Sequence, residues 1–124
     1  MAAKKVLIVD DNSYIRTILA VHLKSGGFET DEADDGTVGL AKISEGGIDL
    51  VLLDVMMPGM SGLEVLDSLK SMPAASEVPV VMISAYGQRE NIINAARCGA
   101  KDFIAKPFTR KLVLEKVNKH IKED

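Results

Sequence analysis

Short apolar runs alternate along the chain with segments in which apolar side chains recur three and four residues apart. The short runs predict buried strands, because they are rich in β-branched and other aliphatic residues. These predicted strands cover residues 5–9, 28–33, 48–54, 78–84 and 102–105. The run 50–53 is wholly apolar and predicts a central strand, whereas polar alternation in residues 28–33 predicts a strand nearer an edge.

A predicted amphipathic helix follows each predicted strand. Asn12 or Ser13 can cap the first helix, and Thr109 can cap the last. Ser61 and Glu64 have the spacing of a capping box, which predicts the start of the third helix.

This alternation predicts an α/β fold. We expect a doubly wound, five-stranded parallel sheet with five helices, in the flavodoxin-like order 2-1-3-4-5. The fourth helix is expected over residues 88–98. A length of 124 residues fits one domain, so we expect residues 1–124 to form a single domain.

Composition narrows the class of protein. An apolar share of 47% argues against disorder, and a single cysteine excludes an intramolecular disulfide, which suits a reducing compartment. The apolar run near the N-terminus is too short for a signal peptide or a membrane span. A net charge of −3 argues against nucleic-acid binding. We therefore expect a cytoplasmic protein that binds neither membranes nor nucleic acid.

Polar side chains follow the predicted strands at the ends that such a sheet brings together. Asp10 and Asp11 follow the first strand, and Asp54 ends the third. Ser84 ends the fourth strand and Lys106 follows the fifth. Carboxylates ~4 Å apart repel by about 4 kcal/mol per pair at an effective dielectric of ~20, so a cation is expected among them. Oxygen ligands without His or Cys favour Mg²⁺.

A metal beside a carboxylate, an ammonium and a hydroxyl is suited to phosphoryl transfer. Asp54 is the candidate nucleophile, because it ends the central strand and a carboxylate can form an acyl phosphate. Asp10 and Asp11 are the candidate metal holders.

Four segments resemble the receiver domains of bacterial two-component response regulators, of the CheY-like, single-domain type. They are residues 6–12 (VLIVDDN), 53–62 (LDVMMPGMSG), 81–85 (VMISA) and 99–108 (GAKDFIAKPF). Their order and spacing cover essentially the whole chain. The resemblance implies a receiver domain over residues 1–124, with no output domain in this chain.

The resemblance also implies a role for each site residue. Asp54 is the phosphoryl acceptor, and Asp10, Asp11 and Asp54 hold Mg²⁺ together with the backbone carbonyl of Met56. Lys106 and Ser84 contact the phosphoryl group. Ser84, Phe103 and Pro107 are switch residues, and the Lys106–Pro107 peptide is cis.

The implied function is that of a signalling switch. The phosphoryl donor is a phosphohistidine on a sensor histidine kinase or phosphotransfer protein, and the protein catalyses its own phosphorylation and slow dephosphorylation. The output is a change in the face made by the fourth helix, fifth strand and fifth helix, which controls binding of a downstream protein. Residues 1–87 carry six basic and thirteen acidic side chains, and residues 88–124 carry nine and five. This difference predicts an acidic partner surface that docks on the basic part, with Lys101, Arg110, Lys111 and Lys116 as candidates.

Other functions that use similar residues need features in addition to those found here. An aspartate-nucleophile phosphatase of the haloacid dehalogenase type needs a second carboxylate two residues after the nucleophile, and Asn12 stands there if Asp10 is that nucleophile. A flavodoxin-type flavin carrier needs a Ser/Thr/Gly-rich phosphate loop where Asp10 and Asp11 lie. A receiver that signals by docking without phosphorylation stays open as an alternative, as does the phosphatase.

Overall fold

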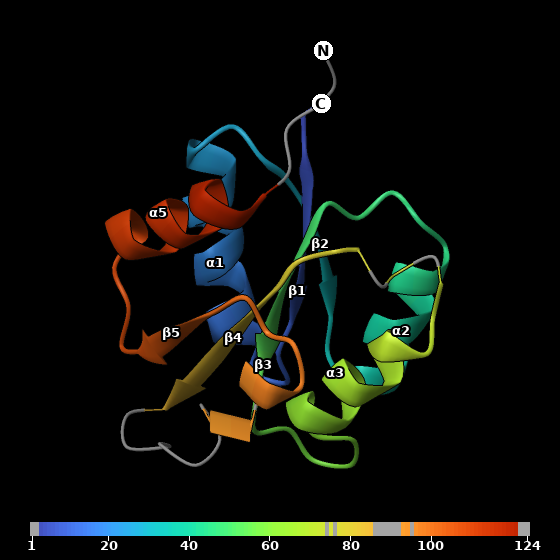
Figure 1. Cartoon of the computed structure of the whole chain (residues 1–124). Helices are drawn as coiled ribbons and strands as arrows, with labels where there is room; N and C mark the ends of the chain where they lie inside the picture. The colour runs from blue at the N-terminus through green and yellow to red at the C-terminus, as the bar shows by residue number, and fades with distance from the viewer. Residues whose placement is uncertain (1–2, 74, 76, 86–92, 95, 122–124) are drawn as a thin grey trace.

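Five parallel strands form one sheet in the computed structural model, which describes residues 3–73, 75, 77–85, 93–94 and 96–121 (Figure 1). They are β1 (Lys5–Val9), β2 (Glu29–Ala33), β3 (Leu50–Asp54), β4 (Val80–Ala85) and β5 (Asp102–Lys106). The strand order is β2-β1-β3-β4-β5, and each neighbouring pair is parallel. The predicted order is confirmed, with β3 central and β2 at an edge.

Helices cover both faces of the sheet. They are α1 (Ser13–Ser25), α2 (Gly36–Ser44), α3 (Gly62–Lys70) and α5 (Arg110–His120). Residues 93, 94, 96 and 97 are helical, which agrees with the predicted fourth helix, while residues 88–92 and 95 of that prediction lie outside the described residues. Within the described ranges, every helix is too short or too polar to span a bilayer.

Side-chain caps define where these helices begin. Asn12 Oδ1 accepts hydrogen bonds from the backbone N–H groups of Tyr14 and Ile15, so Asn12 rather than Ser13 is the first cap. The predicted capping box is present in both directions, between Ser61 and Glu64. Thr109 caps α5, also as predicted.

Alternation along the buried strands divides the core into two layers. Val6 and Ile8 of β1 pack with α1 and α5, and Leu7 and Val9 pack with α2 and α3. Figure 1 shows these two pairs of helices on opposite sides of the sheet. Because α1 follows β1 and α3 follows β3 on different faces, the chain departs from the carboxyl ends of β1 and β3 in opposite directions, which leaves a crevice between those ends.

Candidate functional site

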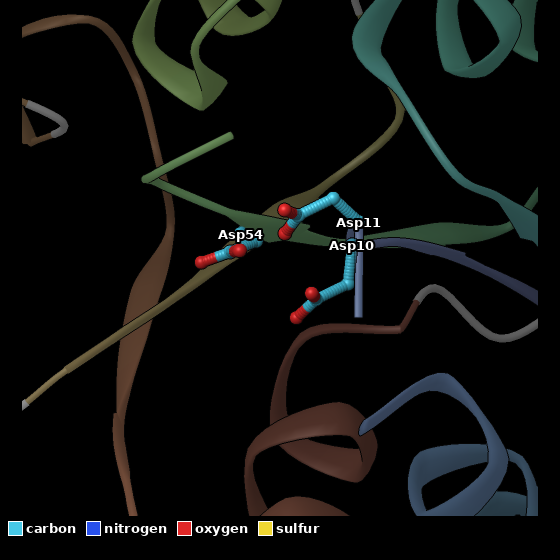
Figure 2. A group of neighbouring side chains, drawn as sticks. All are labelled: Asp10, Asp11 and Asp54. Atoms are coloured by element: carbon cyan, nitrogen blue, oxygen red, sulfur yellow. The ribbon is translucent and has the colours of Figure 1, made fainter. Parts of the chain in front are cut away.

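Three carboxylates meet at the carboxyl ends of β1 and β3. Oxygen atoms of Asp10, Asp11 and Asp54 lie within 4.8 Å of one another, and Figure 2 shows the side chains turned toward a shared space. Asp10 and Asp54 become neighbours because β1 and β3 pair in parallel, with Val9 opposite Leu53. We call these three residues the acidic cluster. Among the described residues it is the group whose spacing fits a metal ion.

Asp10 is held tightly at the base of the acidic cluster. Its side chain is 1% exposed, and its Oδ1 accepts a hydrogen bond from the Asn12 N–H at 2.9 Å. Its carbonyl oxygen accepts from Arg16 Nη1 at 2.7 Å, and Arg16 Nε reaches Glu32 Oε1 at 3.1 Å. Asp11, in contrast, is exposed at the mouth of the site. The cluster therefore has a fixed inner carboxylate and an outer one open to solvent.

Asp54 is buried between the other carboxylates and a lysine. Lys106 Nζ lies 3.6 Å from Asp54 Oδ1 and 3.4 Å from Asp10 Oδ2. Burial and then the charge of Asp10, with a smaller effect from Asp11, raise the pKa of Asp54 to about 6, against the lowering effect of Lys106 and the Met56 N–H. A cation in the cluster would relieve this repulsion and favour the ionised carboxylate.

Gly62 packs closely against the backbone of Asp54 and Val55. A Cβ at Gly62 would overlap the carbonyl oxygen of Asp54 and come within 2.9 Å of Val55 Cα. The Gly62 N–H donates to the Val55 carbonyl at 2.9 Å, so the first turn of α3 packs against the end of β3. Only a residue without a side chain allows this close approach.

The other predicted site residues lie around this crevice at different distances from the carboxylates. Ser84 is fully buried in β4, and its Oγ donates to the Ala85 carbonyl at 3.4 Å, which is a long and weak hydrogen bond. Phe103 is half-buried in β5 and packs against the core layer under α2 and α3. Among the described contacts, neither side chain touches the acidic cluster.

Met56 and Pro107 complete the set of predicted residues. Met56 is 59% exposed, and its backbone nitrogen lies 3.4 Å from Asp54 Oδ1, which places its backbone beside the Asp54 carboxylate. The Lys106–Pro107 peptide is cis, as the sequence resemblance implies. Of all the predicted residues outside the cluster, Lys106 is therefore the one whose side chain reaches it among the described contacts.

Two residues of the site were missed by the sequence reasoning. Gly62 lies within the predicted capping box of Ser61 and Glu64, but its packing against Asp54 depends on the path of the loop between them. Arg16 sits on α1 and joins the backbone of Asp10 to Glu32 of β2, and no sequence spacing signals that contact.

Comparison with known proteins gives one consistent family. The profile of the family "Response regulator receiver domain" matches residues 6–118. The chemotaxis protein CheY of Pseudomonas aeruginosa is 40% identical over 116 residues, which are 93% of this chain and 94% of that protein. The structure of Vibrio cholerae CheY4 superposes with a TM-score of 0.91 at 29% identity, covering 97% of this chain and 100% of the other.

A longer protein contains the same fold. NtrX from Brucella abortus matches with a TM-score of 0.89 at 38% identity, over 96% of this chain and 27% of that one. The arrangement found here therefore resembles both a CheY protein and one part of a larger protein. By its profile match, its curated relatives and its fold, the chain belongs to the response regulator receiver domain family of two-component systems.

Proposed function

We propose that this chain is a phosphorylation-dependent switch in which Asp54 accepts a phosphoryl group from a phosphohistidine. The donor belongs to a sensor histidine kinase or a phosphotransfer protein. The observation that carries the proposal is the position of Asp54, buried at the end of the central strand among two carboxylates and the ammonium of Lys106. A carboxylate in that position is set up as a nucleophile toward a group that a cation and an ammonium help to neutralise.

The acidic cluster fits Mg²⁺. Its donors are carboxylate oxygens, the ligands that this hard cation prefers, and their mutual repulsion favours a divalent ion. Asp10, Asp11 and Asp54 would hold it, with the backbone carbonyl of Met56 as a further oxygen donor. When bound, the ion supplies neutralising charge for the transferring phosphoryl oxygens.

The transfer step forms one bond and breaks another. A carboxylate oxygen of Asp54 attacks phosphorus as the P–N bond to the donor histidine breaks, and the imidazole nitrogen keeps the electron pair of that bond. Lys106 lies close enough to Asp54 to pair with the phosphoryl oxygens after transfer. Asp54 must be ionised for this attack, so Lys106 also helps by favouring the charged carboxylate.

Ser84 and Phe103 couple the acyl phosphate to the surface. The weak hydrogen bond of Ser84 to Ala85 can be exchanged for a stronger one to a phosphoryl oxygen. Strand β4 pairs with β5 so that Met82 lies opposite Phe103, which puts the switch aromatic on the strand next to Ser84. The output is a population shift in the face made by the predicted fourth helix, β5 and α5.

A protein donor needs a docking surface beside Asp54. Tyr14 and Val21 of α1 are 71% and 61% exposed, and Ile18 is half-buried between them on the same helical face. Tyr14, at the start of this apolar stripe, follows Asp11 of the acidic cluster by three residues, so we propose that the donor protein packs against the stripe.

The downstream partner is proposed to carry an acidic surface. Lys101 and Lys111 are exposed, and their positive charges would face the acidic surface of the partner. Lys116 is already paired with Asp102 at 2.8 Å, and Arg110 Nε donates to Ser25 Oγ at 2.7 Å. Lys101 and Lys111 are therefore the stronger candidates of the four predicted residues, and their charges should affect mainly association rate and salt dependence.

Labelling with a small phosphoryl donor tests the proposed function. Wild-type protein incubated with acetyl phosphate and Mg²⁺ should gain one acid-labile phosphoryl group, detected by intact-protein mass spectrometry. Asp54→Asn should gain none, because an amide is a poor nucleophile, and removing Mg²⁺ with EDTA should suppress labelling of the wild type. Asp34→Asn, the same change at an exposed position, is the matched control. Wild-type protein that stays unlabelled would favour signalling by docking alone.

A further inference from the structure

A cavity lies at the opposite end of the sheet from the acidic cluster. Its volume is about 610 Å³, within the range of small-molecule sites. The end of α3, the amino end of β4, the segment that leads into β5 and the last turn of α5 surround it. Asp54 and Ser84 lie at the carboxyl ends of their strands, so this cavity is separate from the proposed phosphorylation site.

The cavity combines an apolar floor with a basic rim. Leu66, Leu69 and Val80 line the floor and are 3–4% exposed. Lys70 and Lys101 line the rim, and both are exposed. The Lys101 N–H donates to the Val80 carbonyl at 2.8 Å, which fixes the backbone of this lysine beside the floor.

The charges around the cavity favour an anion. His120 also lines it, and its Nε2 lies 2.7 Å from Asp102 Oδ2. Asp102 is further bonded to Lys116 at 2.8 Å, so its negative charge is already compensated. Glu77 is the opposing carboxylate among the described lining residues. Among the described lining residues, two lysines thus face one carboxylate.

We propose that this cavity binds a small organic anion with an apolar body, of the aromatic or aliphatic acid class. The apolar part lies on Leu66, Leu69 and Val80, and the acid group pairs with Lys70 and Lys101. The size of the cavity and its apolar floor indicate a small ligand with an apolar body, and the basic rim indicates that the ligand carries negative charge. The inference does not depend on the phosphorylation of Asp54.

The probe for the test is 1-anilinonaphthalene-8-sulfonate, an aromatic anion whose fluorescence increases when it moves from water into an apolar site. Wild-type protein should bind it at one saturable site. Reversing the rim with Lys70→Glu and Lys101→Glu should weaken binding by about tenfold or more. The matched control, Lys24→Glu with Lys111→Glu, changes the net charge equally at exposed lysines that do not line the cavity, and its affinity should stay within about twofold of the wild type.

Backbone NMR shifts give an independent readout of the same binding. Titration with the probe should move the amide signals of Leu69, Val80 and Lys101, and leave those of the acidic cluster unchanged. Circular dichroism on each variant verifies that it is folded. Equal weakening by the rim and control variants, or shifts spread over other faces, would overturn the proposal.

Discussion

Asp54 is an ionisable side chain that the fold buries among like charges. Burial first, and then the charge of Asp10, raise its pKa from 3.8 to about 6. Between about pH 4 and 6 the folded state therefore binds more protons than the unfolded state, and the free energy of unfolding falls as the pH rises through this window. The proposed chemistry thus carries a cost in stability at neutral pH when no cation is present.

Asp54→Asn should reveal this cost. Without Mg²⁺ at pH 8, the variant should have a free energy of unfolding higher than that of the wild type by on the order of 1 kcal/mol or more, because it removes a charge held among carboxylates. Urea unfolding at pH 8 and at pH 3.5 measures the difference, which should shrink at the lower pH. Asp34→Asn should show no such pH dependence. A gap of the same size at both pH values would contradict the explanation.

Gly62 should not tolerate a methyl group. Gly62→Ala places a Cβ against the backbone of Asp54, so we expect a loss of about 2 kcal/mol or more in stability together with slower phosphorylation. Gly39→Ala is the matched control, since the atoms nearest to its Cβ would belong to the side chain of Val9, from 3.1 Å, and not to backbone. That change should stay within about 1 kcal/mol, because alanine also has the better helix propensity. Equal losses from the two substitutions, measured by urea unfolding, would argue against backbone overlap as the cause.

At the scale of elements, an ion network ties α5 to β5. Burial raises the pKa of Asp102, but hydrogen bonds from Lys116 and His120 and from the Phe103 N–H lower it to about 2. The folded pKa lies below the unfolded value of 3.8, so the stabilisation is present above about pH 4 and is lost as the pH falls toward 2.

Asp102→Asn should remove this stabilisation. The loss at pH 6 is expected to be about 1 to 3 kcal/mol, as for hydrogen bonds to charged groups. Between pH 4 and 2, the unfolding free energy of the variant should fall less steeply than that of the wild type, as followed by urea denaturation. Asp67→Asn, an exposed change in α3, serves as the control. If the unfolding free energies of wild type and Asp102→Asn depend on pH in the same way, the network is not the cause of the stability loss at low pH.

Strand and helix positions follow closely from the apolar pattern, and the exceptions have physical reasons. β1 has the predicted bounds, but β4 begins after Pro79, because proline has no N–H to give to the sheet. The bond between His120 and Asp102 joins the end of α5 to the start of β5. No helical spacing relates those two residues, so their pairing could not be predicted from the order of residues along the chain.

The site could be predicted to a similar extent. The acidic cluster was expected because parallel strands bring their carboxyl ends to one edge, and Asp10, Asp11 and Asp54 are found there together. The packing of Gly62 and the bridge made by Arg16 depend on how loops and neighbouring elements meet in space. Periodicity and motif spacing do not predict contacts of that kind.

For the whole molecule, a bound cation should raise thermal stability. Anything that binds the folded state alone stabilises it, by about 1.4 kcal/mol at ten times the dissociation constant, which corresponds to a Tm increase of about 5 °C for a domain of this size. Asp11→Asn should reduce the response to Mg²⁺ by removing an exposed ligand, whereas Asp34→Asn should keep it. A full response from Asp11→Asn in a thermal melt would exclude Asp11 from the metal site.

The central claim is that Asp54 becomes an acyl phosphate, and chemical trapping tests it most directly. Borohydride reduces an acyl phosphate to an alcohol and so converts the modified aspartate to homoserine, which peptide mass spectrometry can place in the sequence. After treatment with acetyl phosphate and Mg²⁺, we predict homoserine at position 54 and unchanged aspartate at positions 10 and 11. Homoserine at another position, or intact Asp54 in protein that carries the phosphoryl group, would contradict the account.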